Sequence, residues 1–194
     1  MKKLTLSLLL GATVVTVSFA KPLKVKPAVF DPDDTGLVSA AWVTHTGLPD
    51  AGKSDHALYL AKQTATATNA AALARIDGVN GIVLTEIGWD VKTGGDCGAG
   101  SPRFNVVTSD GVTHFIGCNS PPPITTLITD RRGVVWERRR YDPAAAFPPI
   151  APGSIVTAIT IVLDEGMDIG VGFTYLDNID INGTLVGKPG NAKK

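Results

Sequence analysis

The sequence predicts an all-β protein, an antiparallel β-sandwich, from three observations. Apolar runs are short, and several alternate with polar residues as half-buried strands do. Turn residues separate these runs, with 21 glycines and 13 prolines among 194 residues. No convincing helical pattern lies between the runs, whereas the parallel sheet of an α/β protein would require such helices.

The first 20 residues have the composition of a signal peptide. Lys2 and Lys3 precede an apolar stretch that is too short to span a bilayer, and Ser18-Phe19-Ala20 ends it with small residues at the two positions that a signal peptidase reads. We expect residues 21–194 to form one secreted β-sandwich domain, extracellular or periplasmic, with its core at about 37–187. No membrane span is expected in this mature chain.

The charge of the mature chain argues against two classes of partner. Without Lys2 and Lys3, 16 of the 18 basic residues remain against 18 acidic ones, a net charge of −2. A nearly neutral chain has no overall attraction to nucleic acid or to anionic lipid, so neither is an expected partner.

The predicted strands follow one another along the chain. They cover residues 37–44, 57–62, 82–91, the two arms of a hairpin within 103–118, 125–129, 134–141, 154–163 and 172–181. Residues 70–76 remain ambiguous, because alanines favour a helix while the threonines before them do not.

The clearest local structure is the hairpin, since Asp110-Gly111 favours a two-residue turn. That turn would set Val107 opposite His114 and Arg103 opposite Cys118. The two cysteines of an exported chain are expected to form a disulfide, Cys97–Cys118, which would pin a glycine-rich loop against the hairpin. Closing this loop would stabilise the fold by about 3 kcal/mol in the chain-entropy model.

The segment YLDNIDING near the end of the chain places a carboxylate among apolar residues. Regular alternation would put Tyr175, Asp177, Ile179 and Ile181 on one face. A buried carboxylate needs hydrogen bonds or an ion pair, so Asp177 is expected to bind an arginine or loop amides. Metal binding and catalysis are the weaker alternatives.

Several segments together resemble a family of exported bacterial proteins with no assigned activity. They are GDCGAGSPRFNVVTSDG, AFPP, ITIVLDEG and GFTYLDNIDINGTLVGKPG, and the resemblance spans residues 37–190 approximately. YLDNIDING is also similar to the last strand of jelly-roll sandwiches of the galactose-binding and carbohydrate-binding-module type. The resemblance implies a jelly-roll fold, but fold analogy does not establish function.

The same resemblance implies a possible structural Ca²⁺, held by an N-terminal loop and an acid of the final strand. Asp31, Asp33 and Asp34 would supply the loop ligands, and Asp177 or Asp180 the strand ligand. The alternative is that the aspartates of the loop only cap a turn through backbone amides. No other cofactor is expected.

The run VVWERRRYD contains the residues expected to bind a ligand. Trp136, Arg138 and Arg140 share one strand face, and Tyr141 lies on the other. If exposed, the aromatic rings could stack on sugars while the arginines donate to hydroxyls. The alternative is an edge strand whose charges prevent pairing with other sheets.

Motifs of catalysis are weak. Residues 47–54 match the phosphate-binding pattern G-x-x-x-x-G-K-[ST], but a strand-like pattern follows where a helix is needed. The three histidines are scattered, and Glu86 and Asp90 on one strand face would lie roughly 13 Å apart, too far for most glycosidases.

We therefore expect a secreted, non-catalytic binding module for glycans or cell-surface polymers. The first alternative is a structural or adhesive envelope protein without a small ligand, in which the side chains of 134–142 would be buried or paired. The second alternative is a secreted hydrolase, which would need two acids, or a histidine and an acid, converging in a cleft.

Overall fold

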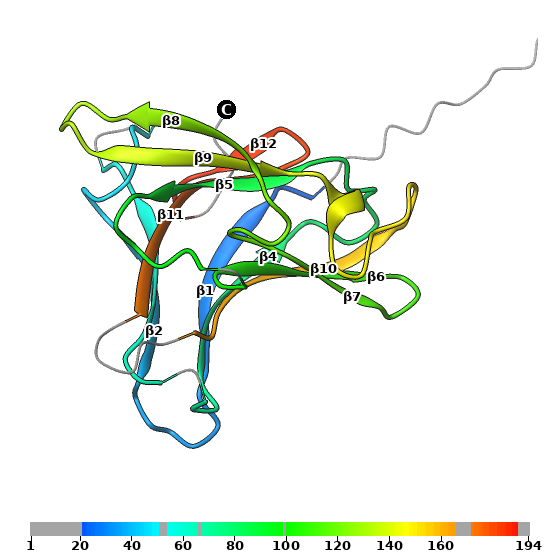
Figure 1. The fold of residues 1–194 in the computed structure, drawn as a ribbon, viewed down its shortest axis with the longest axis horizontal. Helices are drawn as coiled ribbons and strands as arrows, with labels where there is room; N and C mark the ends of the chain where they lie inside the picture. Colours follow the sequence, from blue (N-terminus) through cyan, green and yellow to red (C-terminus); the bar gives the residue numbers. More distant parts are fainter. Residues whose placement is uncertain (1–20, 51–53, 66, 99, 166–171, 190–194) are drawn as a thin grey trace, which may run out of the picture.

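The computed structural model describes residues 21–50, 54–65, 67–98, 100–165 and 172–189, and it is a β-sandwich of two antiparallel sheets (Figure 1). The five-stranded sheet has the order β1 (Lys24–Phe30), β4 (Ala71–Asp77), β10 (Val156–Leu163), β6 (Arg103–Thr108), β7 (Thr113–Ile116). The seven-stranded sheet has the order β2 (Val38–Val43), β3 (Ala57–Lys62), β11 (Gly172–Ile181), β5 (Ile87–Lys92), β9 (Val135–Tyr141), β8 (Ile124–Thr129), with β12 (Thr184–Val186) paired to β11. This arrangement confirms the predicted fold class and is compatible with a jelly roll.

Two strands lie where the sequence did not predict them. β1 precedes the expected core at residue 37, yet its Val25 is buried, and β12 is only three residues long. Within 82–91 only the second half is a regular strand. The ambiguous segment 70–76 forms β4, because its alanines fit between β1 and β10. In the described part of the chain, no helix is long and apolar enough to cross a bilayer.

The hydrophobic core fills the space between the two sheets. Leu58 and Leu60 of β3 and Trp89 of β5 are fully buried there, as strand alternation predicts. Trp89 stacks on Phe104 of the opposite sheet with ring centroids 4.4 Å apart. Trp42 packs against the same core and donates its indole N–H to the carbonyl of Val25, 3.0 Å away in the other sheet.

The predicted hairpin forms, but its register differs from the predicted one by one residue. Val106, not Val107, lies opposite His114. The amide of Gly111 donates to the Thr108 carbonyl and the amide of Thr108 to the Val112 carbonyl, so the turn contains one residue more than expected. Gly111 adopts φ = +83°, the left-handed conformation that such a bulged turn requires.

The predicted alternation of the final strand is also wrong beyond Asp177. The register of β11 against β5 shifts between Asp177 and Asp180, and Asn178 adopts φ = +45°. This β-bulge inserts one residue, so that Ile179 and Ile181 point into the core together with Leu176. Asp177 therefore belongs to the outer face of the sheet and is not part of an apolar row.

Candidate functional site

The aromatic residues predicted to stack on sugars are buried. Trp136 is 0% exposed and Tyr141 is 2% exposed. Trp136 points away from the sandwich core, but the described residues 44–50 and 54–56, here called the cover loop, place Leu48 against it. Tyr141 points into the core, where its ring meets Trp89 edge-on at 5.8 Å. The predicted binding surface on β9 is therefore not formed by these two side chains.

The two arginines of that surface neutralise buried acids. Arg138 donates from Nε and Nη2 to the two carboxylate oxygens of Asp90, at 3.0 Å each. Arg140 contacts Asp180 at 2.7 Å from its Nε. Asp90 is 0% exposed, and its hydrogen bonds raise the pKa of Arg138. Burying these carboxylates without the arginines would be costly, which is a structural reason for both positions.

Asp177 fastens the cover loop to the sheet. It is 0% exposed, and its Oδ2 accepts a hydrogen bond of 2.7 Å from the Leu48 amide. Its Oδ1 accepts another of 2.5 Å from the amide of Asn178. Binding of loop amides was one of the two structural roles expected for this residue.

Further contacts hold the same loop from the side of β8. Arg132 donates to the carbonyls of His45 and Gly47, and Arg131 pairs with Asp55. Gly47 lies so close to the His56 carbonyl that an added Cβ would be 1.8 Å from its oxygen. Packing therefore explains the glycine at position 47, which is the first glycine of the phosphate-binding pattern. The segment after the pattern forms strand β3 and not the helix that a phosphate-binding loop requires. Residues 51–53, which include Lys53, lie outside the described residues.

The aspartates of the predicted calcium site do not come together. Asp31 accepts hydrogen bonds from the amides of Thr35 and Gly36, so it caps a turn, and the hydrogen bonds from Thr35 lower its pKa. Asp33 and Asp34 are exposed in the same loop. Among the described residues, no group of three or more acids, histidines or cysteines could hold a metal ion.

Strand register explains the separation. The loop of Asp31 precedes Val38, which pairs with Lys62, and Lys62 pairs with Gly172 at the start of β11. Asp177 lies five residues further along β11, roughly 16 Å away at the usual rise per residue. Asp180 lies beyond it and is bound by Arg140, so neither strand acid can share an ion with the loop.

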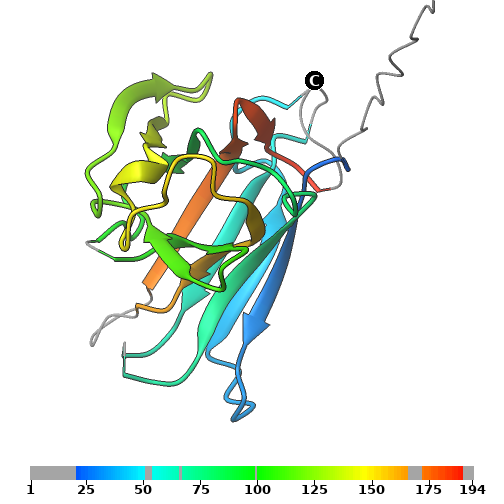
Figure 2. The same cartoon turned by 90° about the vertical axis from the view of Figure 1, so that its right-hand side faces the viewer.

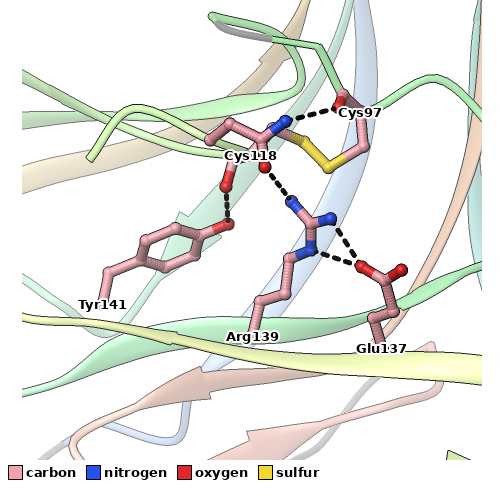
Figure 3. Close-up of a disulfide and its surroundings, with 6 residues drawn as sticks. Cys97, Cys118, Glu137, Arg139 and Tyr141 are labelled. Atoms are coloured by element: carbon pink, nitrogen blue, oxygen red, sulfur yellow. Dashed lines mark hydrogen bonds and ion pairs between the residues drawn. A yellow bond between two sulfur atoms is a disulfide. The ribbon is translucent and has the colours of Figure 1, made fainter. Parts of the chain in front are cut away.

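The predicted disulfide Cys97–Cys118 is present and is tied to β9 (Figure 3). Arg139 bonds to Glu137 and also to the side chain of Asn119, whose amide group donates to the Cys97 carbonyl at 3.3 Å. The hydroxyl of Tyr141 donates to the Cys118 carbonyl at 3.1 Å. The disulfide loop therefore covers the inner face of β9, as the cover loop covers the outer one.

The outer face of the seven-stranded sheet has an open half beside the cover loop. Register places Tyr59 of β3 next to Tyr175 of β11, whose other neighbour is Lys92 of β5. Phe173 lies two residues before Tyr175 on the same face. The ring centroids of this aromatic trio, Tyr59, Phe173 and Tyr175, are 5.0 to 6.3 Å apart.

The trio is available to a ligand in three respects. Each ring is half-buried, so part of it reaches solvent. The neighbouring positions Ser39 and Ala41 of β2 carry small side chains that reach solvent, which leaves room beside the rings. Within the described residues neither tyrosine hydroxyl makes a hydrogen bond, while burial and the nearby Tyr175 raise the pKa of Tyr59. Lys92 holds its ammonium group 5.1 Å from the Tyr175 ring centroid.

The residues considered for catalysis have structural partners. His114 lies between the Thr108 hydroxyl at 3.0 Å and the Pro148 carbonyl at 2.7 Å. His56 contacts Asp50 at 3.0 Å, and Asp90 is bound by Arg138. His114, His56 and Asp90 are therefore held by contacts within the fold.

Two hollows lie away from all of these groups. One of about 680 Å³ is lined by the segments 75–82 and 157–160 and by Lys21. The other, of about 490 Å³, is lined mainly by 67–71, Arg103, the buried Lys62 and two acids, Asp164 and Glu165. Arg103 pairs with Asp164 at 2.6 Å, and burial and the neighbouring Asp164 raise the pKa of Glu165. Lys62 donates to the carbonyls of Thr68 and Asp164, and burial lowers its pKa, so its ammonium group is used within the fold.

Sequence reasoning missed the aromatic trio because its members come from two separate strands. Tyr175 stood in the analysed row, but the pairing of β3 with β11, which brings Tyr59 beside it, cannot be read from either segment alone. Comparison with protein-family models, with curated proteins and with solved structures gave no match. The site must therefore be interpreted from its own geometry.

Proposed function

We propose that this protein is an exported, non-catalytic module that binds glycans or similar cell-surface polymers on the aromatic trio. The observation that carries the proposal is the gathering of three half-exposed rings on an open sheet face, with two tyrosine hydroxyls free of hydrogen bonds to the described residues. Sugar rings present apolar C–H faces to aromatic side chains and hydroxyls to polar groups. The trio offers both kinds of contact.

The surroundings of the trio favour a preorganised site. The three rings already contact one another, so little side-chain entropy would be lost on binding. Lys92 adds a donor and a positive charge at one end, which would suit hydroxyl-rich or acidic sugars. The small, exposed side chain of Ala41 would let a polymer lie close to the sheet.

Export rests on the composition of the first 20 residues, and the disulfide is compatible with an oxidising compartment. The final strand, YLDNIDING, also resembles that of jelly-roll binding modules, but this resemblance does not by itself establish function.

The test is a polysaccharide and glycan-array screen of the purified protein, with and without Ca²⁺. Tyr59→Ala and Tyr175→Ala should each weaken binding to any retained glycan by about tenfold, the loss typical of one stacked ring. Phe147→Ala is the matched control, since Phe147 is an aromatic residue exposed elsewhere. Absence of any retained glycan, or equal binding by the tyrosine variants and the control, would contradict the proposal.

A structural or adhesive envelope protein is the second candidate. It is favoured by the burial of Trp136 and Tyr141 and by the ion pairs of Arg138 and Arg140, as that alternative predicts. An envelope-fractionation experiment separates the candidates: a structural protein should remain with the envelope when Tyr59 and Tyr175 are both changed to alanine, whereas a glycan-binding module should be released.

A further inference from the structure

We infer that two copies of this chain pair through β8, edge to edge and antiparallel. β8 is the last strand of the seven-stranded sheet, and Figures 1 and 2 show it at the margin of the molecule. Its Ile124 and Leu127 are 79% and 69% exposed, the first and third most exposed of the large apolar residues in the described part of the chain. This inference is independent of the glycan site, which lies on β3 and β11.

The outward edge of β8 presents backbone groups that can pair. The amide of Asp130 donates to the carbonyl of Val134, the residue before β9, so the backbone N–H and C=O groups at even positions of β8 point toward β9. By alternation, Thr125, Leu127 and Thr129 direct their N–H and C=O groups outward. Unpaired groups in such a row are a template for another strand.

Two other sheet edges carry protection that β8 lacks. β1 contains Lys24, Lys26 and Pro27, which discourage pairing. β7 is closed by Phe147, which exchanges two backbone hydrogen bonds with Phe115. β2 has no charge and no proline, but its large apolar side chains are half-buried, unlike Ile124 and Leu127 of β8. β8 itself, ITTLIT, has no charge and no proline, and the prolines 121–123 only limit its N-terminal end.

The side-chain pattern of ITTLIT favours a second copy in antiparallel orientation, because an isoleucine lies two residues to either side of Thr126 and the strand can therefore pair with itself. A two-fold axis at Thr126 places Ile124 opposite Ile128 of the second copy in a close, non-hydrogen-bonded pair. Thr125 of each copy then lies opposite Leu127 of the other copy. These two pairs together form about four backbone hydrogen bonds.

The predicted dimer is closed and weak. Two-fold pairing of one edge uses up that edge in both copies, so it does not propagate into fibres. A strand pair of this length falls at or below the low end of specific interfaces, about 1,200 Å² in total, so dissociation in the micromolar range is expected. The two cysteines are bonded to each other, so the dimer would not be disulfide-linked.

Sedimentation velocity of the protein between about 1 and about 300 µM tests the inference. The wild type should shift from monomer to dimer over this range. Leu127→Pro removes an outward N–H that the fold does not use and should weaken the dimer at least tenfold, about 1.4 kcal/mol. Leu127→Ala, which keeps that N–H, is the matched control and should retain most of the association.

A charge exchange tests the register. Thr126→Lys and Thr126→Glu each place like charges on the two-fold axis and should be monomeric alone, while their mixture should form a heterodimer. Thermal midpoints are measured first, because Arg138 lies beside Thr126 in the same sheet. A wild type that stays monomeric at the highest concentration, or a dimer of unchanged affinity in Leu127→Pro, would overturn the inference; a mixture that fails to pair would overturn the register.

Discussion

The outer face of the seven-stranded sheet has two halves that the same fold treats differently. Over β9 and the middle of β11 the cover loop packs Leu48 against Trp136 and binds the buried Asp177 through the Leu48 amide, while Arg138 binds the buried Asp90. Over β3 and the first half of β11 the rings of Tyr59 and Tyr175 are only partly buried, and Tyr175 packs against the edge of the cluster of Leu48 and Trp136. The difference shows that aromatic residues on one strand face indicate a binding surface only where no loop lies over them.

Removing the buried ring of Trp136 from the covered half should have the largest effect on the free energy of unfolding. Trp136→Ala should lower the free energy of unfolding by about 3 to 5 kcal/mol, because it leaves a cavity beneath Leu48. Tyr59→Ala in the open half should lower it by about 1 kcal/mol, since that ring is already partly in water. Urea titration of both variants with an unchanged m-value measures the contrast, and similar losses would show that the halves are not distinct.

The next effect concerns the disulfide, which covers the inner side of β9. Replacing Cys97 and Cys118 together by serine should lower the free energy of unfolding by about 3 kcal/mol in the chain-entropy model. Denaturant titration measures it, and the reduced wild type is the control. A double variant as stable as the oxidised protein would mean that the contacts of Arg139 and Asn119 alone hold this loop.

Detaching the cover loop at one point should have a smaller effect. Asp177→Ala removes the acceptor of the Leu48 amide and should lower the free energy of unfolding by about 2 kcal/mol. Hydrogen exchange should accelerate at Leu48 more than at amides of β3. Asp33→Ala, an exposed acid in another loop, is the control and should change neither quantity.

The core tyrosine Tyr141 and Tyr59 of the open half should also differ in the pH at which they ionise. Burial raises the pKa of Tyr141 far above its usual value, so the folded protein keeps a proton that the unfolded chain releases near pH 10. The unfolded state then binds fewer protons, and the free energy of unfolding should fall above pH 10 by up to about 1.4 kcal/mol per pH unit. The lowered pKa of Lys62 acts in the opposite sense below about pH 10.5.

Phenolate absorbance followed during an alkaline titration checks this difference. Tyr59, whose pKa is raised but whose ring reaches solvent, should ionise while the protein is folded. Tyr141 should ionise only as the protein unfolds, and Tyr141→Phe should remove that late step. Ionisation of all tyrosines before any loss of structure would contradict the assignment.

Most of the fold could be predicted because it depends on local periodicity. The alternation of 57–62 and 172–176 and the turn residues of 103–118 each specify a strand or turn without reference to the rest of the chain. β1 could not be found in this way, because its lysines and proline hide the single buried Val25. The hairpin register failed for a related reason, since Asp-Gly suits both two-residue and longer turns.

The candidate site was harder to predict because it depends on which strands are neighbours. The sequence correctly marked Trp136 as notable, but its burial is decided by a loop some 80 residues earlier in the chain. The trio exists because β11 inserts between β3 and β5, a pairing of segments more than 80 residues apart. Single-segment patterns carry no information on such neighbours.

The bulge at Asn178 decides which side chains of β11 face the core. Before it, even-numbered side chains are buried in the core; after it, odd-numbered ones are. Deleting Asn178 would turn Ile179 and Ile181 toward solvent and Asp180 toward the core, although the rest of the sequence would be unchanged. Insertion or deletion of one residue in β11 should therefore disturb the fold more than a typical single substitution.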